Sequence, residues 1–360
     1  MTSPAPIDSF WAVVPAGGAG TRLWPLSRAS APKFLHDLRG SGRTLIQETY
    51  DRLAPLAPGR MVVVTGAAHQ EAVARQLDQL PPEAILAEPS ARDSMAAIGL
   101  AAALVERADP DAVMGSFAAD HVILDDEGFT AAVRTAVEVA RDGWLVTLGV
   151  EPTFASSAFG YIRSGDRLED HAGAWRVAEF VEKPSVEVAE GYLAAGGYRW
   201  NAGMFVARPG VLLDLLAETD PAFAAALREL AADGSRLDEV WPQLPRIAVD
   251  HAVAEPAATA GRVAVVPASF DWEDVGDFDS LAGLLAREGE SVTVLGDADV
   301  RVVDASGLVV AGGRTIAVVG LDDVVVVDTP DALLVTTRAR AQDVKAVVAA
   351  LKESGRGDLT

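Results

Sequence analysis

Residues 11–28 read WAVVPAGGAGTRLWPLSR, an apolar run that ends in a cluster of glycines followed by Thr21 and Arg22. The apolar run predicts a buried strand, and the glycines predict a tight turn after it. Neither common nucleotide motif matches, because Leu23 stands where a dinucleotide fingerprint counted from Gly18 needs glycine, and the P-loop pattern is missing as well. The glycines alone leave a plain turn and a phosphate-binding loop equally open.

Two cations near the glycines favour the phosphate-binding loop. Arg22 follows directly, and Lys33 lies in the segment SRASAPKF, where Pro25 and Pro32 disfavour a continuous helix. Backbone N–H groups of a glycine turn, combined with two positive side chains, form a suitable cradle for a polyphosphate. We expect the remaining contacts to come from the loop itself, namely from Ala16, Gly17, Gly18, Gly20 and Thr21.

The composition excludes several classes of protein. The 360 residues carry a formal net charge of −22, which argues against affinity for nucleic acid, and they include no cysteine, which excludes disulfides and thiolate metal sites. No apolar stretch approaches the roughly 20 residues of a membrane span, and the start MTSPAPIDSF lacks a basic region followed by an apolar one. We expect a cytoplasmic protein with neither nucleic acid nor membrane as a partner.

Up to about residue 150, short apolar runs alternate with helical patterns. The runs predict strands at residues 11–15, 61–65, 84–86, 112–117 and 144–148, and the segments between them predict helices at 44–53, 69–80, 94–107 and 129–141. Thr44 and Gln47 have the spacing of a capping box. This alternation indicates an α/β fold, Rossmann-like, with a mixed, mainly parallel sheet that binds ligands at the carboxyl ends of its strands.

The rest of the chain divides near residue 288. Residues 151–287 mix strand and helix candidates, which predicts an insertion that completes the sheet and forms a wall of the substrate site. After Gly289, short valine-rich runs separated by Gly and Asp predict a small all-β module, closed by a helix in DVKAVVAAL. We therefore expect a catalytic domain over residues 1–287 and a C-terminal β module over residues 288–360.

Two acidic motifs are candidates for a metal site. SFAADHVI, residues 116–123, places Asp120 at the end of a predicted strand, where a carboxylate can face the ligand. FDWEDVGDF, residues 270–278, interleaves Asp274 and three other acids with apolar side chains, which disfavours a freely solvated loop. A turn cap at Asp120 and a solvated loop around Asp274 are the alternative interpretations.

Further motifs supply polar groups of other kinds. FVEKP, residues 180–184, contains Glu182 and Lys183, which are otherwise an ordinary surface pair. FGYI contains Gly160, whose missing side chain allows close approach of a ligand or marks a bulge, and WNAGMF contains Asn201, whose amide suits a hydroxyl. AEPSARDSMAAIGLAAA, residues 87–103, predicts the start of a helix at Ser94.

Together, these ordered motifs resemble those of the sugar-nucleotide pyrophosphorylases. PAGGAGTRLWPLSR followed by PKF is similar to the mannose-1-phosphate guanylyltransferase branch in particular, and the likeness covers nearly the whole chain. The resemblance implies that Asp120 and Asp274 bind Mg²⁺, that Glu182 hydrogen-bonds sugar hydroxyls and that Lys183 contacts the sugar phosphate. It also implies that the C-terminal module is a short left-handed β-helix.

The same resemblance implies a base pocket in the segment around residue 90. Glu88, Pro89 and Arg92 match the family pattern E-P-x-x-R-N-[ST], while Asp93 stands where asparagine is usual. In the family's P-A-D-H motif, Ala118 replaces the proline. Both departures leave the fold intact but bear on the selectivity of the base and on the backbone beside the metal site.

The implied reaction joins GTP and α-D-mannose 1-phosphate to give GDP-mannose and pyrophosphate. The sugar phosphate attacks the α-phosphorus in line, so positioning and charge neutralisation are the enzyme's main tasks. We expect Arg22 to hold the leaving pyrophosphate, Lys33 the α-phosphate region and Lys183 the sugar phosphate. The alternatives are a related enzyme that uses another sugar or base, and a catalytically silent regulatory relative. The sequence is also compatible with a homo-oligomer.

Overall fold

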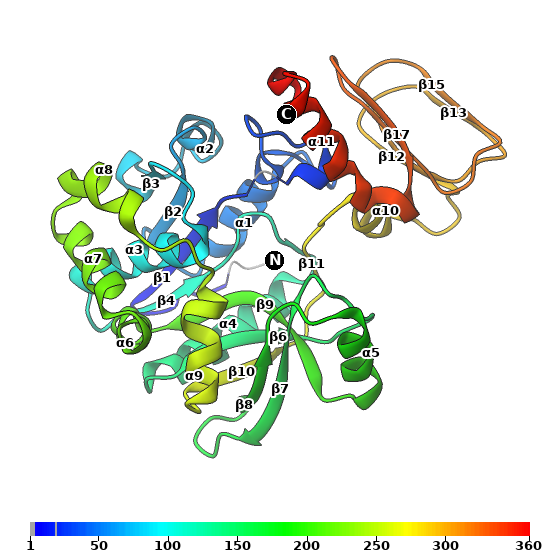
Figure 1. Ribbon diagram of the computed structural model, residues 1–360. Coiled ribbons are helices and arrows are strands. Elements are labelled where there is room, and N and C mark those ends of the chain that lie inside the picture. Colours follow the sequence, from blue (N-terminus) through cyan, green and yellow to red (C-terminus); the bar gives the residue numbers. More distant parts are fainter. Residues whose placement is uncertain (1–3, 19) are drawn as a thin grey trace.

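The computed structural model describes residues 4–18 and 20–360. Its centre is a nine-stranded mixed sheet in the order β3-β2-β1-β4-β9-β6-β10-β8-β7 (Figure 1). The strands of this sheet are β1 Phe10–Ala16, β2 Met61–Gly66, β3 Ile85–Glu88, β4 Val113–Ser116, β6 Leu145–Val150, β7 Gly160–Arg167, β8 Trp175–Val181, β9 Tyr198–Ala207 and β10 Val263–Ala268.

The first four predicted strands pair with one another in parallel. β1 pairs in parallel with β2 and β4, and β2 with β3. The insertion completes the sheet as predicted: β10 joins β6 in parallel, while β9 and the β7–β8 hairpin pair antiparallel with their neighbours. The predicted α/β fold with a mixed sheet is confirmed, with its parallel pairs concentrated around β1.

Helices cover both faces of the sheet, as the alternation of side chains along β1 requires. Ala12 and Val14 face a core shared with α1, α2 and α4, whereas Val13 faces a core shared with α3, α6 and α7. The helices of this domain are α1 Leu45–Leu53, α2 Gln70–Gln76, α3 Asp93–Ala108, α4 Asp126–Arg141, α5 Val186–Ala195, α6 Pro209–Thr219, α7 Pro221–Ala232, α8 Leu237–Val240, α9 Glu255–Thr259 and α10 Phe278–Leu285.

Local signals set several of these boundaries. The predicted capping box is present at α1, where the Thr44 backbone N–H donates to Gln47 Oε1 at 3.1 Å. Pro221 follows the Asp220 N-cap of α7, a helix that the periodicity did not predict.

Among the described residues, no helix is long and apolar enough to cross a membrane.

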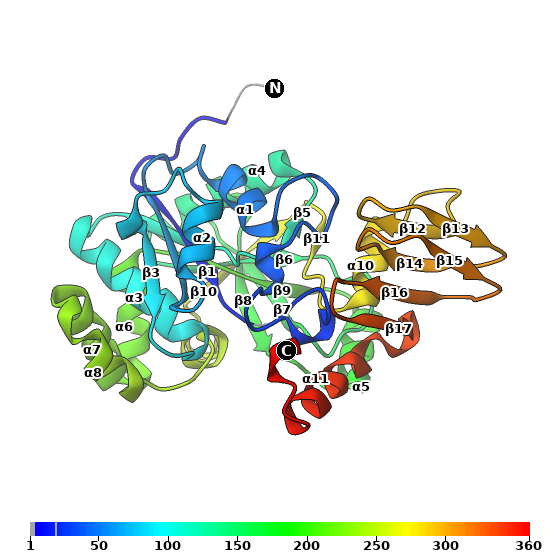
Figure 2. The same ribbon diagram turned by 90° about the horizontal axis from the view of Figure 1, so that it is seen from above.

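The C-terminal module consists of short strands stacked on one another (Figure 2). β12, β14 and β16 pair in parallel, β13 pairs in parallel with β15, and β17 closes the stack antiparallel to β16. The module contains β12 Val292–Leu295, β13 Val300–Val303, β14 Gly307–Val310, β15 Ile316–Val319, β16 Val324–Asp328, β17 Leu333–Thr337, the 3-10 helix η7 Arg338–Asp343 and α11 Val344–Glu353. Parallel coils of this kind confirm the predicted all-β module, and α11 is its closing helix.

The module does not stand apart from the rest of the chain. One hydrophobic cluster joins Leu23 and Trp24, just after β1, with Phe278 of α10 and with Val344 and Val348 of α11. Figure 1 shows α11, in red, running back over the blue N-terminal segments. The C-terminal helix therefore lies on the loop that the sequence singled out first.

Candidate active site at the carboxyl ends of the strands

The glycine loop follows β1, and some of its positions need glycine while others would accept a side chain. Gly18 and Gly20 have φ of +82° and +57°, in the left-handed region that favours glycine. A Cβ on Gly20 would lie 2.9 Å from Ser27 Oγ, whereas Cβ atoms on Gly17 and Gly18 would meet nothing within 4 Å. Gly20 is thus required for packing, and Gly17 and Gly18 border open space; Ala19 lies outside the described residues.

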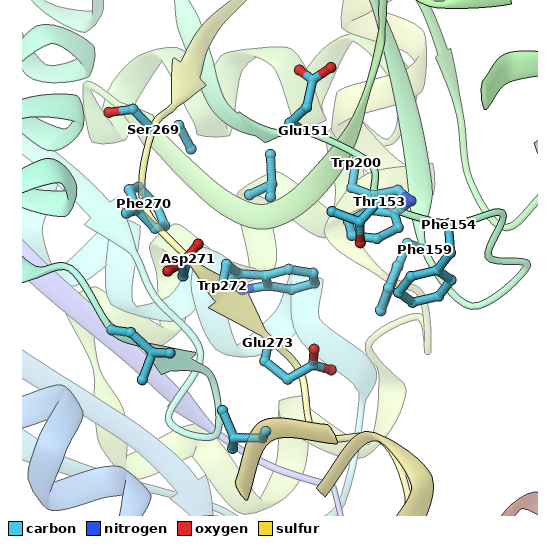
Figure 3. Close-up of a pocket in the computed structure, with 14 residues that line it drawn as sticks. Glu151, Thr153, Phe154, Phe159, Trp200, Ser269, Phe270, Asp271, Trp272 and Glu273 are labelled. Carbon is cyan, nitrogen blue, oxygen red and sulfur yellow. The ribbon is translucent and has the colours of Figure 1, made fainter. Parts of the chain in front are cut away.

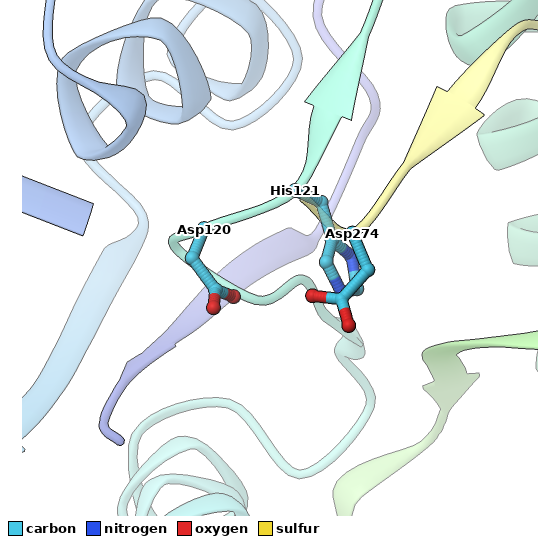
Figure 4. Close-up of side chains that lie close together, drawn as sticks. All are labelled: Asp120, His121 and Asp274. Atoms are coloured by element: carbon cyan, nitrogen blue, oxygen red, sulfur yellow. The ribbon is translucent and has the colours of Figure 1, made fainter. Parts of the chain in front are cut away.

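The two acidic motifs come together through a short two-stranded sheet. β5 Val122–Ile123 and β11 Trp272–Glu273 pair antiparallel, with Val122 opposite Glu273. This register brings together Asp120, His121 and Asp274, which each offer one ligand atom within 4.8 Å of the others (Figure 4). The cluster could hold a divalent cation, since two carboxylates and an imidazole are ordinary ligands.

Lys33 lies between the two carboxylates. Its Nζ is 2.8 Å from Asp120 Oδ2 and 3.0 Å from Asp274 Oδ1, and it donates to the Asp274 carbonyl at 2.6 Å. Burial opposes the charge of Lys33, but the two carboxylates outweigh it and raise the pKa of Lys33. Burial likewise opposes ionisation of Asp120, and Lys33 with His121 outweighs it and lowers the pKa of Asp120. Lys33 therefore neutralises the acidic cluster; its expected contact with an α-phosphate stays a prediction.

A cavity of about 380 Å³ opens beside the glycine loop. Its lining includes the predicted residues Ala16, Gly17, Gly18, Glu88, Arg92 and Asp120. Arg246 also lines it, a residue that no sequence motif indicated because it is a lone arginine in an irregular segment. Two arginines and a glycine-rich backbone suit a phosphorylated ligand in this cavity.

Glu88 has the environment of a buried acceptor without a donor. Its Oε1 is buried and has no hydrogen-bond partner among the described residues. Burial raises the pKa of Glu88 to about 7. A ligand that brings N–H donors to this position would satisfy the carboxylate.

The two departures from the family pattern also border this cavity. Asp93 has φ of +63°, a conformation that aspartate and asparagine tolerate better than most residues, and its Oδ1 accepts from the Ser94 N–H at 2.8 Å. Aspartate can therefore replace asparagine without changing this turn. Ser94 lies at the predicted helix start, but its hydroxyl accepts from the Val249 N–H instead of capping α3. Nothing in the structure explains why alanine stands at position 118 in place of the proline of the pattern.

The sugar-site candidates gather around the β7–β9 pairing. Gly160 lies opposite Asn201, and a Cβ on Gly160 would collide with Glu182 Oε2. The missing side chain of Gly160 thus makes room for Glu182. Lys183 donates to Glu182 Oε1 at 2.6 Å and has φ of +49°, which non-glycine residues rarely adopt. The Glu182 side chain is 7% exposed and that of Lys183 61%, so only the lysine extends into solvent.

Asn201 is held by the protein more fully than the sequence implied. Its Oδ1 accepts from Thr147 at 2.9 Å and from the Gly203 N–H at 3.1 Å, and its Nδ2 donates to Asp250 at 2.7 Å. Burial, with a contribution from Glu182, raises the pKa of Asp250 to about 6. Asp250, which no motif indicated, is therefore a further candidate in this site.

A second cavity, of about 460 Å³, is lined by aromatic side chains that include Trp200 of β9 (Figure 3). Trp200, next to Asn201 on the strand, points into it and packs against Phe154 and Phe159. The cavity reaches the acidic cluster through Trp272, whose ring lies 5.2 Å from that of His121. Trp272 and Glu273, which line the cavity, directly precede Asp274 in the chain.

Arg22 lies at the junction of the glycine loop, β11 and the C-terminal module. Its Nη1 donates to Gln342 Oε1 at 3.3 Å, and a Cβ on Gly276 would lie 3.8 Å from its Nη2. The structure thus brings Arg22 next to the turn that follows Asp274. Gln342 carried no sequence signal, because it is a single amide in a short segment of the C-terminal module.

Comparisons with known proteins agree with this arrangement. The family model described as Nucleotidyl transferase matches residues 11–288, and that described as MannoseP isomerase/GMP-like beta-helix domain matches residues 297–351. The chain is 41% identical over 357 residues to the Xanthan biosynthesis protein XanB of Xanthomonas campestris pv. campestris, covering 97% of this chain and 74% of that one. It is 40% identical to the mannose-1-phosphate guanylyltransferase of Escherichia coli, covering 97% of this chain and 75% of the other.

A solved structure shows the same architecture. The crystal structure described as mannose-1-phosphate geranyltransferase from Thermus thermophilus is 35% identical and aligns with a TM-score of 0.86, covering 96% of this chain and 99% of the other. Family match, relatives and fold agree over nearly the whole length. The chain therefore belongs to the nucleotidyl transferase family, in its mannose-1-phosphate guanylyltransferase branch.

Proposed function

We propose that this enzyme transfers GMP from GTP to α-D-mannose 1-phosphate, releasing pyrophosphate and giving GDP-mannose. The observation that carries the proposal is the convergence of Asp120, Asp274 and Lys33 beside the glycine-loop cavity, in a chain of this family. The relatives named as mannose-1-phosphate guanylyltransferases support the choice of sugar and base.

The buried Glu88 carboxylate supports guanine as the base. Guanine presents two adjacent donors, the ring N1–H and the 2-amino group, which a single carboxylate can accept together. Glu88 lines the cavity and its Oε1 has no partner among the described residues. Arg92 and Arg246 border the same cavity and complement the charge of a bound nucleotide.

The acidic cluster fits Mg²⁺ as the cofactor. Asp120 and Asp274 supply two carboxylates, and Mg²⁺ commonly takes one or two of these and completes its shell with water and phosphate oxygens. When bound, the ion would neutralise phosphate charge between the two substrates. Lys33 contacts both carboxylates and would hold them in place before the ion binds. Once the ion neutralises the carboxylates, the Lys33 ammonium would be able to turn to a phosphate oxygen.

The remaining residues bind and orient the two substrates. The backbone amides of Gly17 and Gly18, which line the cavity, would together with Arg22 hold the leaving pyrophosphate. Lys183, largely exposed beside Glu182, would meet the sugar phosphate, and its unusual backbone is of the kind that collects at functional sites. Glu182 and Asp250 would accept hydrogen bonds from sugar hydroxyls, with Asn201 fixing Asp250. The nucleophile is an anionic phosphate oxygen, so no general base is required.

The test is release of pyrophosphate with each nucleoside triphosphate paired with mannose 1-phosphate and with glucose 1-phosphate. We expect the highest kcat/KM for GTP with mannose 1-phosphate, and none without a divalent cation. Preference for another nucleotide or sugar would refute the assignment of base or sugar. Absence of release with every pair would favour a silent regulatory protein.

The domain division near residue 288 is also a proposal. The first family match ends at residue 288 and the second begins at residue 297, which supports a boundary in this region.

A further inference from the structure

The C-terminal module holds the loop that carries Arg22 at three points. We call residues 20–28 the Arg22 loop. Trp24 Nε1 donates to the Leu359 carbonyl at 2.6 Å, Arg28 forms two hydrogen bonds with Asp331 at 2.7 and 2.6 Å, and Arg22 donates to Gln342. Leu23 and Trp24 are buried in a cluster with Val344 and Val348 of α11. The LWPLSR residues thus contact the module, whereas the open glycines before them face the cavity.

Gln342 differs from the other two contacts because it connects two parts of the candidate active site. Its Oε1 accepts from Arg22, and its Nε2 donates to Asp277 Oδ2. Asp277 is buried and caps α10 through its Oδ1, accepting from the N–H groups of Asp279 and Ser280 at 2.9 and 3.0 Å. The amide is thereby tied to a rigid helix start, directly after the turn that carries Asp274.

The segment that carries Gln342 is itself anchored on α10. Arg338, at the start of η7, donates to Asp279 at 2.7 Å, and Ala341, next to Gln342, is buried in the cluster shared with Phe278. Gln342 therefore has a fixed backbone on which to hold a long and flexible arginine. Without a partner, the Arg22 side chain would lose more rotamer freedom on meeting a phosphate.

A neutral amide suits this place better than a charge. The Gln342 amide lies between the Arg22 guanidinium and the Asp277 carboxylate and hydrogen-bonds to each, in place of a direct ion pair between them. Only one of the five N–H donors of Arg22 is used in this contact, and no other described residue accepts a hydrogen bond from its side chain, which leaves donors for phosphate oxygens.

We propose that Gln342 is a positioning residue of the reaction: from the C-terminal module it orients Arg22 toward the leaving pyrophosphate and couples the Arg22 loop to the Asp274 turn. The proposal rests on the role proposed above for Arg22. It gives the β module a part in catalysis through a single side chain.

The test is a double-mutant cycle in the full-length enzyme. Gln342→Leu keeps the size of the side chain and removes both hydrogen bonds, and we expect it to lower kcat/KM on the order of tenfold, chiefly through kcat. In an Arg22→Ala background, the same change should have almost no further effect, since its action passes through Arg22. Arg340→Ala, whose guanidinium pairs only with Asp343 in the same segment among the described residues, is the matched control and should retain wild-type rates.

A purely structural role would give a different result. If Gln342→Leu reduces kcat/KM by the same factor with and without Arg22, or leaves it at the wild-type value, the proposal is overturned. Thermal unfolding of each variant separates loss of folded protein from loss of rate. The affinity for magnesium pyrophosphate, measured by calorimetry in the same four proteins, gives a second cycle that does not depend on the base or the sugar. If the proposed substrates are wrong, the wild type will show no turnover while this binding cycle still shows the coupling between Gln342 and Arg22.

Discussion

The buried ammonium of Lys33 lies 2.8 Å from the carboxylate of Asp120, although 87 positions separate them in the chain. Lys33 also pairs with Asp274, so one cation balances both candidate metal ligands. This relationship makes the stability of the protein depend on its acidic cluster.

Replacing Lys33 with methionine should therefore destabilise the protein most when metal is removed. The two carboxylates would then lie together without a cation, and we expect the free energy of unfolding in chelator to fall by about 2–4 kcal/mol. Saturating Mg²⁺ should recover part of this loss, because it binds the folded state only. Urea unfolding with and without Mg²⁺ measures the effect. Lys345→Met on the exposed surface is the control, and equal losses in both conditions would contradict this account of Lys33.

Removing the Arg22 guanidinium should slow the reaction without unfolding the protein. In the proposed reaction Arg22 stabilises charge on the departing pyrophosphate, and such a contact is worth on the order of 100-fold in turnover. Steady-state kinetics of Arg22→Ala, compared with Arg43→Ala at the surface ion pair with Asp51, measures it. A folded Arg22→Ala protein with turnover near that of the wild type would refute the role.

Replacing Asp274 with asparagine should weaken the dependence on magnesium. The amide is a poorer ligand for Mg²⁺, and we expect the concentration for half-maximal activity to rise at least about tenfold. Asp271→Asn, in the same loop but lining the second cavity, is the matched control. An unchanged magnesium titration in Asp274→Asn would show that this carboxylate is not a ligand.

Glu88 should make stability fall as the pH rises toward neutrality. Its pKa is about 7 in the folded protein against an ordinary value of 4.5, so between these values the folded state holds more protons than the unfolded state. The wild type should lose about 1–3 kcal/mol relative to Glu88→Gln between pH 4.5 and pH 7, after allowance for partial exposure.

Urea unfolding at both ends of this pH range measures the difference, with Glu83→Gln at an exposed neighbouring position as the control.

The Glu88 carboxylate should also make GTP binding depend on pH, with binding improving as the pH rises. Because guanine requires an acceptor, KM for GTP should rise as the pH falls below about 7, and Glu88→Gln should abolish that dependence. Parallel pH profiles for the wild type and Glu88→Gln would exclude the proposed role of this carboxylate.

Much of the fold follows from local patterns in the sequence. Apolar runs alternating with helical segments predicted β1 to β4, β6 and α1 to α4, and the Thr44–Gln47 spacing predicted the capping box at α1. Short strands without periodicity were missed: β5 and β11 have two residues each, too few to show a pattern. Yet it is their pairing that brings Asp120 and Asp274 together.

The sequence by itself determined the β1 strand, the left-handed glycines after it and the order of the motifs, because these depend on backbone preference and residue type. The tertiary structure decided which groups meet. Lys33 lies between two carboxylates, and Leu23 and Trp24, which the sequence offered only as part of a family resemblance, are buried in one cluster with residues of α11. Such contacts join segments 241 to 335 positions apart, as in Lys33 with Asp274 and Trp24 with Leu359. Their geometry depends on how the β module packs on the catalytic domain, which no local pattern of residues encodes.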